Sequence, residues 1–152
     1  MKKNIVLAFD MDNTICDTNS EVLKLITEFC IKNNSVEMEY LIENKGLKKD
    51  EAIFNVLENC IKYSNKNTTI TIQISKNTFF SKITITDQGI GIKKENYNNI
   101  FQRFYRAQEV QDEDGIGIGL YLTREILSRE EGYITVQSEY GKGSTFTIYL
   151  KR

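Results

Sequence analysis

Two glycine-rich runs in this sequence have the composition of a phosphate-binding loop. The run DGIGIGLYL, from Asp114 to Leu122, places three glycines directly before an apolar, helix-like segment. Each glycine costs conformational entropy on folding, so three of them here need a reason. Glycines at a helix start expose backbone N–H groups, and the positive end of the helix dipole favours a phosphate group. This run therefore predicts a phosphate cradle where a helix begins.

The second run, DQGIGI from Asp87 to Ile92, directly follows the strand-like segment KITIT. A carboxylate at a strand end can accept a hydrogen bond from an amino group, and Gly89 and Gly91 would let a ligand ring approach the backbone. A plain turn is the alternative interpretation. Taken together, the two runs are predicted to bracket one nucleotide.

Other phosphate-binding loops also use glycine, but the residues around these runs disfavour them. A dinucleotide fingerprint needs a strand immediately before its glycines. Here the polar residues EVQDED precede them and the spacing is GxGxG. A P-loop is excluded because no Gly-Lys followed by Ser or Thr comes after these glycines.

A polar stripe runs along the predicted helix FNVLENCIKYS. Asn55, Glu58, Asn59 and Lys62 fall at i, i+3, i+4 and i+7, so they share one helix face. A solvated face is the alternative, although Asn is a poor helix former. Carboxamide oxygens can ligate Mg²⁺ directly or through water. The acid and the lysine add a candidate base and a positive charge for phosphate.

Composition limits the remaining possibilities. The 152 residues are 40% hydrophobic and 27% charged, as in a globular chain, and the net charge of -1 provides no field that would attract nucleic acid. The absence of histidine excludes His-based triads and a phosphorylated His within the chain. The three cysteines are far apart and form no CxxC, so a reducing, cytoplasmic location is expected. No apolar run approaches the length of a membrane span, so no membrane contact by this chain is expected.

The elements that must position these residues follow from hydrophobic periodicity. Strands are predicted over residues 4–9, 69–75, 82–87, 133–138 and 144–150. Helices are predicted over residues 20–32, 50–63 and 119–130, with a short helix or turn within 93–106. From residue 50 onward this order fits helices grouped on one face of a mostly antiparallel sheet, an α+β fold.

Five segments, in order, resemble motifs of one family. NVLENCIKYS resembles the asparagine box of sensor histidine kinases, and DQGIGI their first glycine box. IFQRFYR resembles their phenylalanine box, DGIGIGLYL their second glycine box, and GKGSTF their closing strand motif. From about residue 49 to 152 the chain therefore resembles the catalytic ATP-binding domain of sensor histidine kinases, within the GHKL ATPase superfamily. The resemblance implies a two-layer α/β sandwich with a mixed, mostly antiparallel sheet, and ATP and Mg²⁺ as cofactors.

The resemblance also implies catalytic and phosphate-binding roles. Asn59 would be the Mg²⁺ ligand with Asn55 beside it, and Glu58 matches an acidic position that acts as a base in some relatives. Phosphates would be held by Lys62, Arg106 and the second glycine run, here Gly115, Gly117, Gly119 and Leu120.

The adenine pocket is implied in the same way. Asp87 would accept a hydrogen bond from the adenine amino group, with Thr145 nearby. Tyr63 and Ile92 would wall the pocket, and Gly89 and Gly91 belong to the same loop. Residues 107–114 would form a mobile lid over ATP.

Residues 1–48 do not fit this family. FDMDNTICDT resembles the first motif, DxDx[TV], of haloacid-dehalogenase-type phosphatases, in which Asp10 would be the nucleophile and Asp12 the acid/base, with Mg²⁺ between them. The later motifs of that family have no counterpart here. We therefore expect a β-α extension that adds a strand to the sheet edge and a helix that covers it.

The function that follows is Mg-ATP binding and transfer of the γ-phosphoryl group to a histidine. The acceptor would lie on a separate chain or missing domain, with a histidine-containing dimerisation domain or a response regulator as partner. A nucleotide-gated binding module with little or no catalysis is the alternative. A Ser/Thr kinase of the anti-sigma-factor type and a phosphatase acting through Asp10 and Asp12 are also considered.

Overall fold

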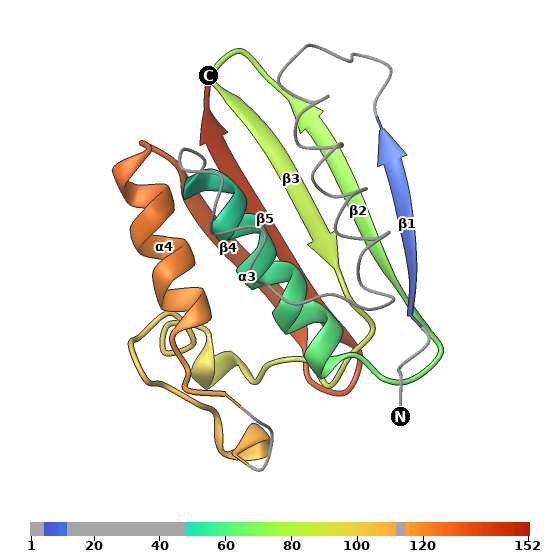
Figure 1. Ribbon diagram of the computed structural model, residues 1–152. Coiled ribbons are helices and arrows are strands. Elements are labelled where there is room, and N and C mark those ends of the chain that lie inside the picture. Colours follow the sequence, from blue (N-terminus) through green and yellow to red (C-terminus); the bar gives the residue numbers. More distant parts are fainter. Residues whose placement is uncertain (1–4, 12–47, 112–114) are drawn as a thin grey trace.

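A five-stranded mixed sheet forms one layer of the protein (Figure 1). The computed structural model describes residues 5–11, 48–111 and 115–152, with side chains described from residue 51 onward. In spatial order the strands are β1 (Ile5–Met11), β2 (Thr68–Lys76), β3 (Phe80–Thr86), β5 (Gly143–Lys151) and β4 (Tyr133–Glu139). β1 pairs with β2 in parallel, and the other three pairings are antiparallel. The α+β fold expected from the sequence is confirmed.

Two helices cover one face of this sheet (Figure 1). Helix α3 (Lys48–Tyr63) and helix α4 (Gly119–Arg129) pack against each other. The hydroxyl of Thr123, fully buried, donates to the carbonyl oxygens of Gly119 at 3.1 Å and Ala52 at 3.3 Å. That side chain therefore fixes α4 against the first half of α3.

Alternating isoleucines build the core between the two layers. Ile70, Ile72 and Ile74 on β2 are buried, as are Ile83 and Ile85 on β3, so every second residue of each strand faces the helices. From the helices, fully buried side chains such as Leu57 and Leu127 meet them. Period-2 alternation in the strands and period-3.6 spacing in the helices thus converge on one core.

The observed boundaries correct the end of the first strand. The first strand continues through Asp10 and Met11, which pair with Gln73 and Ile74 of β2, so the acidic turn does not start at Asp10. This strand lies at the sheet edge, as expected. As predicted, residues 93–106 contain a short helix, the 3-10 helix η1 (Lys94–Asn96), followed by turns. The helix predicted over residues 20–32 lies outside the described residues.

The segment expected to be a lid also has regular structure. A second 3-10 helix, η2 (Gln108–Val110), opens it, while residues 112–114 lie outside the described part of the chain. Among the described helices, none is long and apolar enough to cross a bilayer.

Truncating Leu57 tests the packing of α3 on the sheet. This side chain is 0% exposed, so Leu57→Ala removes buried apolar surface and leaves a cavity. We expect the free energy of unfolding to fall by about 2–5 kcal/mol. Phe79→Ala, at a side chain that is 71% exposed, is the control and should change it by less than about 0.5 kcal/mol. Equal effects in urea-induced unfolding would contradict this description of the core.

Candidate functional site

The C-terminal end of α3 touches the first glycine run directly. Ser64 forms an isolated antiparallel bridge with Gly89, and the N–H of Ile90 donates to the carbonyl of Tyr63 at 3.2 Å. A Cβ atom on Gly89 would lie 2.3 Å from that same carbonyl oxygen. Gly89 is therefore required for the helix end and the loop to meet.

Asp87 is buried at this junction, with only 5% of its surface exposed. Its Oδ1 atom accepts hydrogen bonds from the N–H of Gly89 at 2.8 Å and of Ser144 at 3.3 Å. Burial raises the pKa of the Asp87 carboxyl, and these two N–H groups oppose the rise. The thiol of Cys60, on α3, is a third and smaller opposing donor. The carboxyl is thus fixed in orientation on three sides.

Gly91 and Gly143 pack the same loop against the turn between β4 and β5. Gly91 has φ +67°, and a Cβ atom there would lie 2.1 Å from the carbonyl oxygen of Glu139. Gly143 has φ +125°, and its Cβ would lie 2.1 Å from the carbonyl oxygen of Asp87. Gly89 and Gly91 were predicted to admit a ligand ring. In the structure both let segments of the protein's own backbone approach one another, and the approach of a ligand ring stays a prediction.

Thr145 is not brought to Asp87. Its hydroxyl lies 3.1 Å from that of Thr86, and both residues alternate with core residues, Phe146 and Ile85, that face the helices. Because successive strand residues point to opposite faces, Thr145 lies on the face away from the helices. The residue beside Asp87 is Ser144, one position earlier, which the sequence analysis missed. The backbone N–H of Asp87 donates to the Ser144 carbonyl at 2.9 Å.

The polar stripe of α3 faces the start of α4. A Cβ atom on Gly119 would lie 3.7 Å from Asn59 Nδ2 and 3.9 Å from Asn55 Cβ. Asn59 Nδ2 donates to the carbonyl of Asn55 at 2.8 Å. Asn55 Nδ2 is buried and has no hydrogen-bond partner among the described residues. Two carboxamides thus share a site with the first turn of α4, while Glu58 on the same stripe is exposed.

Lys62 completes this arrangement at the other end of the stripe. Its Nζ atom lies 3.0 Å from where a Cβ atom of Gly115 would be, and 5.0 Å from the centre of the Tyr63 ring. The ammonium group therefore reaches the second glycine run. Ile92 and Leu120 are partly buried and pack against the core, so both also have a structural role.

The second glycine run is attached to the phenylalanine-box segment. The N–H of Phe104 donates to the carbonyl of Gly117 at 2.9 Å. Gly117 has φ +75°, and a Cβ atom there would lie 2.6 Å from the Tyr105 carbonyl oxygen. Arg106 Nη2 donates to the carbonyl of Val110 in η2. The two ends of the lid segment are thus held together, and Arg106 contacts the lid itself.

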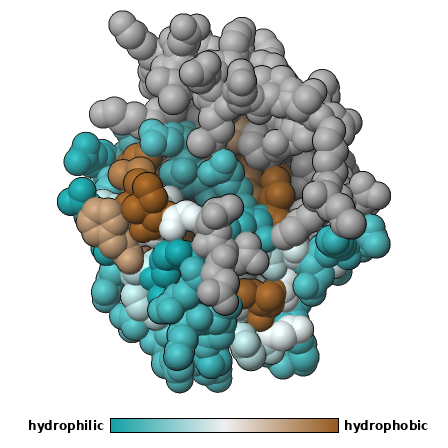
Figure 2. Space-filling model, turned by 60° about the horizontal axis from the view of Figure 1, so that its bottom comes forward, coloured by the Kyte–Doolittle hydropathy of each residue, from teal (hydrophilic) through white to brown (hydrophobic). Residues whose placement is uncertain are grey.

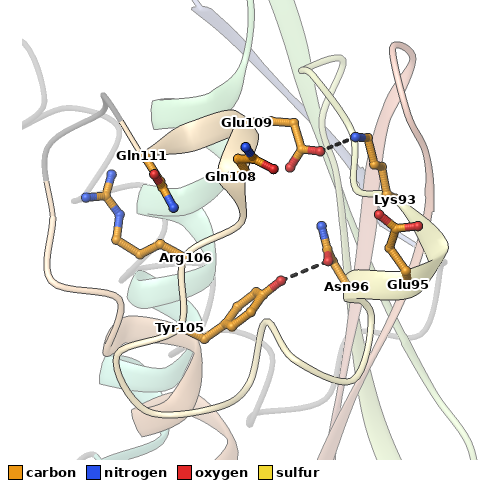
Figure 3. Close-up of a pocket in the computed structure, with 8 residues that line it drawn as sticks. All are labelled: Lys93, Glu95, Asn96, Tyr105, Arg106, Gln108, Glu109 and Gln111. Atoms are coloured by element: carbon orange, nitrogen blue, oxygen red, sulfur yellow. Dashed lines mark hydrogen bonds and ion pairs between the residues drawn. The ribbon is translucent and has the colours of Figure 1, made fainter.

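A pocket of about 370 Å³ lies between η1 and η2 (Figure 3). Only Arg106 among its lining residues was predicted as a site residue; the others are Lys93, Glu95, Asn96, Tyr105, Gln108, Glu109 and Gln111. An ion pair between Lys93 and Glu109 crosses it, and the Tyr105 hydroxyl donates to Asn96 Oδ1 at 2.8 Å. This pairing raises the pKa of Lys93 and lowers that of Glu109. The ion pair between Lys93 and Glu109 therefore links the lid segment to the start of η1.

The surface at the loop end of the molecule is mostly hydrophilic, with separate hydrophobic patches (Figure 2). Large exposed hydrophobic side chains include Phe104 at 59% and Ile116 at 68%. Phe104 leads into the lid segment and Ile116 lies in the second glycine run. Polar surroundings of this kind suit a charged ligand.

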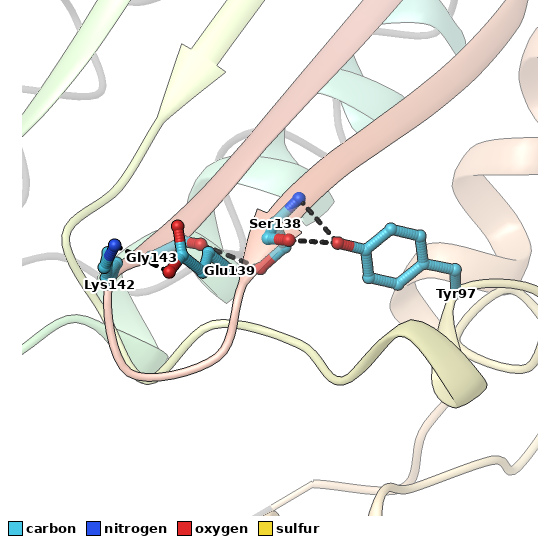
Figure 4. A network of polar contacts seen from close by, with 5 residues as sticks. All are labelled: Tyr97, Ser138, Glu139, Lys142 and Gly143. Carbon is cyan, nitrogen blue, oxygen red and sulfur yellow. Dashed lines mark hydrogen bonds and ion pairs between the residues drawn. The ribbon is translucent and has the colours of Figure 1, made fainter.

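A second polar network, also missed by the sequence analysis, connects η1 to the hairpin of β4 and β5 (Figure 4). The Tyr97 hydroxyl accepts from the N–H of Ser138 at 2.9 Å and donates to its carbonyl. No local pattern indicates this contact, because its residues lie 41 positions apart in the chain.

Comparison with known protein families identifies the family to which this chain belongs. The family described as "Histidine kinase-, DNA gyrase B-, and HSP90-like ATPase" matches residues 46–152. The chain belongs to this family of ATP-binding domains. That range contains α3, both glycine runs and every described residue of the site.

Individual relatives with similar sequences are histidine kinases. The sensor-like histidine kinase SenX3 of Mycolicibacterium smegmatis is 35% identical over 101 residues, 65% of this chain and 26% of its own. The histidine protein kinase SaeS of Staphylococcus epidermidis is 36% identical over 107 residues, 68% of this chain and 30% of its own. The chain thus spans less than a third of the length of these curated relatives. The matched part of this chain is therefore similar to one part of these longer histidine kinases.

Solved structures agree on the fold. The mycobacterial sensor histidine kinase MprB superposes with a TM-score of 0.66 at 19% identity, covering 97% of this chain and 81% of that one. The catalytic domain of the histidine kinase ThkA gives 0.64 at 18% identity, covering 97% and 80%. At these identities the likeness supports the architecture.

Replacing Gly91 tests the close packing of the first glycine run. Gly91 and Gly141 have similar φ angles, +67° and +86°, but a Cβ on Gly141 would meet nothing within 4 Å. Alanine at either position costs about 1–2 kcal/mol for the left-handed conformation. Because Gly91→Ala must also displace the Glu139 carbonyl, we expect it to lose about 1–3 kcal/mol more in urea unfolding. Equal losses in the two variants would contradict this packing.

Proposed function

We propose that this chain binds Mg-ATP at the junction of α3, the 87–92 loop and the start of α4, and transfers its γ-phosphoryl group to a histidine. The observation that carries the proposal is the convergence of Asn55, Asn59 and Lys62 with Gly115 and Gly119. Two carboxamides and an ammonium group meet a glycine-rich helix start there, which is the composition expected around a metal-bound polyphosphate.

The residues present fit a magnesium ion. Asn59 Nδ2 donates to the carbonyl of Asn55, so the carboxamide oxygen of Asn59 is the atom that would face a cation. Asn55 Nδ2, a buried donor without a partner in the described part of the chain, would suit a phosphate oxygen. Mg²⁺ prefers oxygen ligands and keeps several waters, so one carboxamide oxygen plus phosphate oxygens would suffice. We assign Asn59 as the ligand, with Asn55 beside it. Bound there, the ion would neutralise charge that develops on the phosphate oxygens.

Asp87 supports adenine as the base. A buried carboxylate with one oxygen already accepting two backbone N–H groups is fixed in direction. An exocyclic amino group is a suitable donor to such a carboxylate. Tyr63 and Ile92, on either side of the Gly89 contact, would wall the ring. Lys62 and Arg106 would bind the phosphates.

The acceptor must lie outside these 152 residues, because they contain no histidine. In the transfer, an imidazole nitrogen would form a bond to the γ-phosphorus while the bond to the β,γ-bridging oxygen breaks and ADP leaves. Glu58, exposed on α3, would accept the proton released from the ring. We place the acceptor on a dimerisation domain or a related partner, and the domain in the cytoplasm, where ATP is available.

The phosphatase alternative has no support from the described site. Asp10 lies in β1, paired with Gln73, and its side chain and Asp12 lie outside the described residues. A second alternative, a binding module, differs from the proposal only in the transfer step. A chain that binds Mg-ATP but phosphorylates no supplied dimerisation domain would be such a module.

Calorimetric titration with a non-hydrolysable ATP analogue, with and without Mg²⁺, tests the site. We expect Mg²⁺-dependent binding that Asn59→Ala weakens by at least about tenfold, since one metal ligand is lost. Asn99→Ala is the matched control, because Asn99 Nδ2 also donates to the carbonyl four residues earlier but lies outside the site. Binding that ignores Mg²⁺, or equal losses in the two variants, would contradict the assignment.

A further inference from the structure

The hydroxyl of Ser138 is a meeting point of three segments. It accepts a hydrogen bond from the N–H of Ile92 at 2.7 Å and donates to the carbonyl of Gly143 at 2.7 Å (Figure 4 shows the second contact). It also lies 3.0 Å from the Ser144 hydroxyl. A serine hydroxyl has one donor and two acceptor positions. With Ser144 as donor, all three are used.

The backbone of Ser138 is held as well. β4 is an edge strand of the described sheet, so no described strand pairs with its outward N–H and C=O groups. The Tyr97 hydroxyl satisfies both of them, as donor to the carbonyl and acceptor from the N–H (Figure 4). Tyr97, next to η1, therefore holds the backbone of Ser138, while the side chain of Ser138 contacts the loop.

From Ser138 the contacts continue to both ends of the 87–92 loop. Ile92, at one end, is bound directly. Asp87, at the other end, is reached through Ser144, whose N–H donates to Asp87 Oδ1 and whose carbonyl accepts from the Asp87 N–H. One hydroxyl thus supports both residues that would contact the base.

We propose that Ser138 is a positioning residue that sets the preference of the site for adenine over 6-oxopurines. The inference rests on the proposed function. Adenine presents an amino group at C6, whereas hypoxanthine presents a carbonyl oxygen that would face the Asp87 carboxylate. A site built to bind a donor rejects the analogue that lacks it only while the acceptor stays in place. Loss of the Ser138 hydroxyl removes its hydrogen bond to Ile92 and its contact with Ser144, two supports of the loop that holds this acceptor.

Titrations with Mg-ADP and Mg-IDP test the inference, since these diphosphates share their ribose and phosphates. We expect wild type to prefer ADP. Ser138→Ala should weaken ADP binding by about tenfold, as expected when hydrogen bonds are lost, and should change IDP binding much less. Ser138→Thr keeps the hydroxyl and should preserve the preference. Ser128→Ala, at an exposed serine on α4, should behave as wild type.

Two kinds of result would contradict these claims, one the positioning role of Ser138 and the other the proposed function itself. Equal weakening of ADP and IDP by Ser138→Ala, or failure of threonine to preserve the preference, would overturn the positioning role alone. A wild type that binds neither diphosphate would overturn the proposed function and this inference with it.

A second variant covers the case in which Ser138→Ala does not fold. Tyr97→Phe removes one hydroxyl on the η1 side and leaves the Ser138 side chain intact. It should lower the ADP preference in the same direction, with a melting temperature near that of wild type. An unchanged preference in this variant would also contradict the proposal.

Discussion

The contact between the end of α3 and Gly89 is the constraint on which the site depends. A backbone bridge joins Ser64 to Gly89, and the carbonyl of Tyr63 occupies the space that any side chain on Gly89 would need. The carboxamides and ammonium group of α3 thereby share one end of the molecule with Asp87. Under the proposed function neither half would form a nucleotide site alone, because the helix would supply the groups for metal and phosphate and the loop the group for the base.

Much of this arrangement could be predicted because its signals are local. Isoleucines at every second position defined β2 and β3, and spacing of three and four residues placed Asn55, Asn59 and Lys62 on one helix face. The order of five short motifs then fixed the family. Local patterns report which face a residue occupies, and here that was enough to identify the elements of the proposed site.

The errors arise where distant segments pack together. Thr145 was expected near Asp87, but strand alternation turns it to the opposite face and brings Ser144 to the site. The packing role of Gly91, which makes room for the Glu139 carbonyl, was not predicted from the sequence. The contact between Tyr97 and Ser138 was missed for the same reason, since only tertiary structure brings the two together.

A crystal structure of the chain with Mg-ADP tests the central claim most directly. The account predicts the adenine amino group within hydrogen-bond distance of Asp87, the metal on the Asn59 side chain, and the diphosphate between Lys62 and the Gly115–Gly119 turn. Nucleotide bound instead in the pocket between η1 and η2, or with its base away from Asp87, would contradict it.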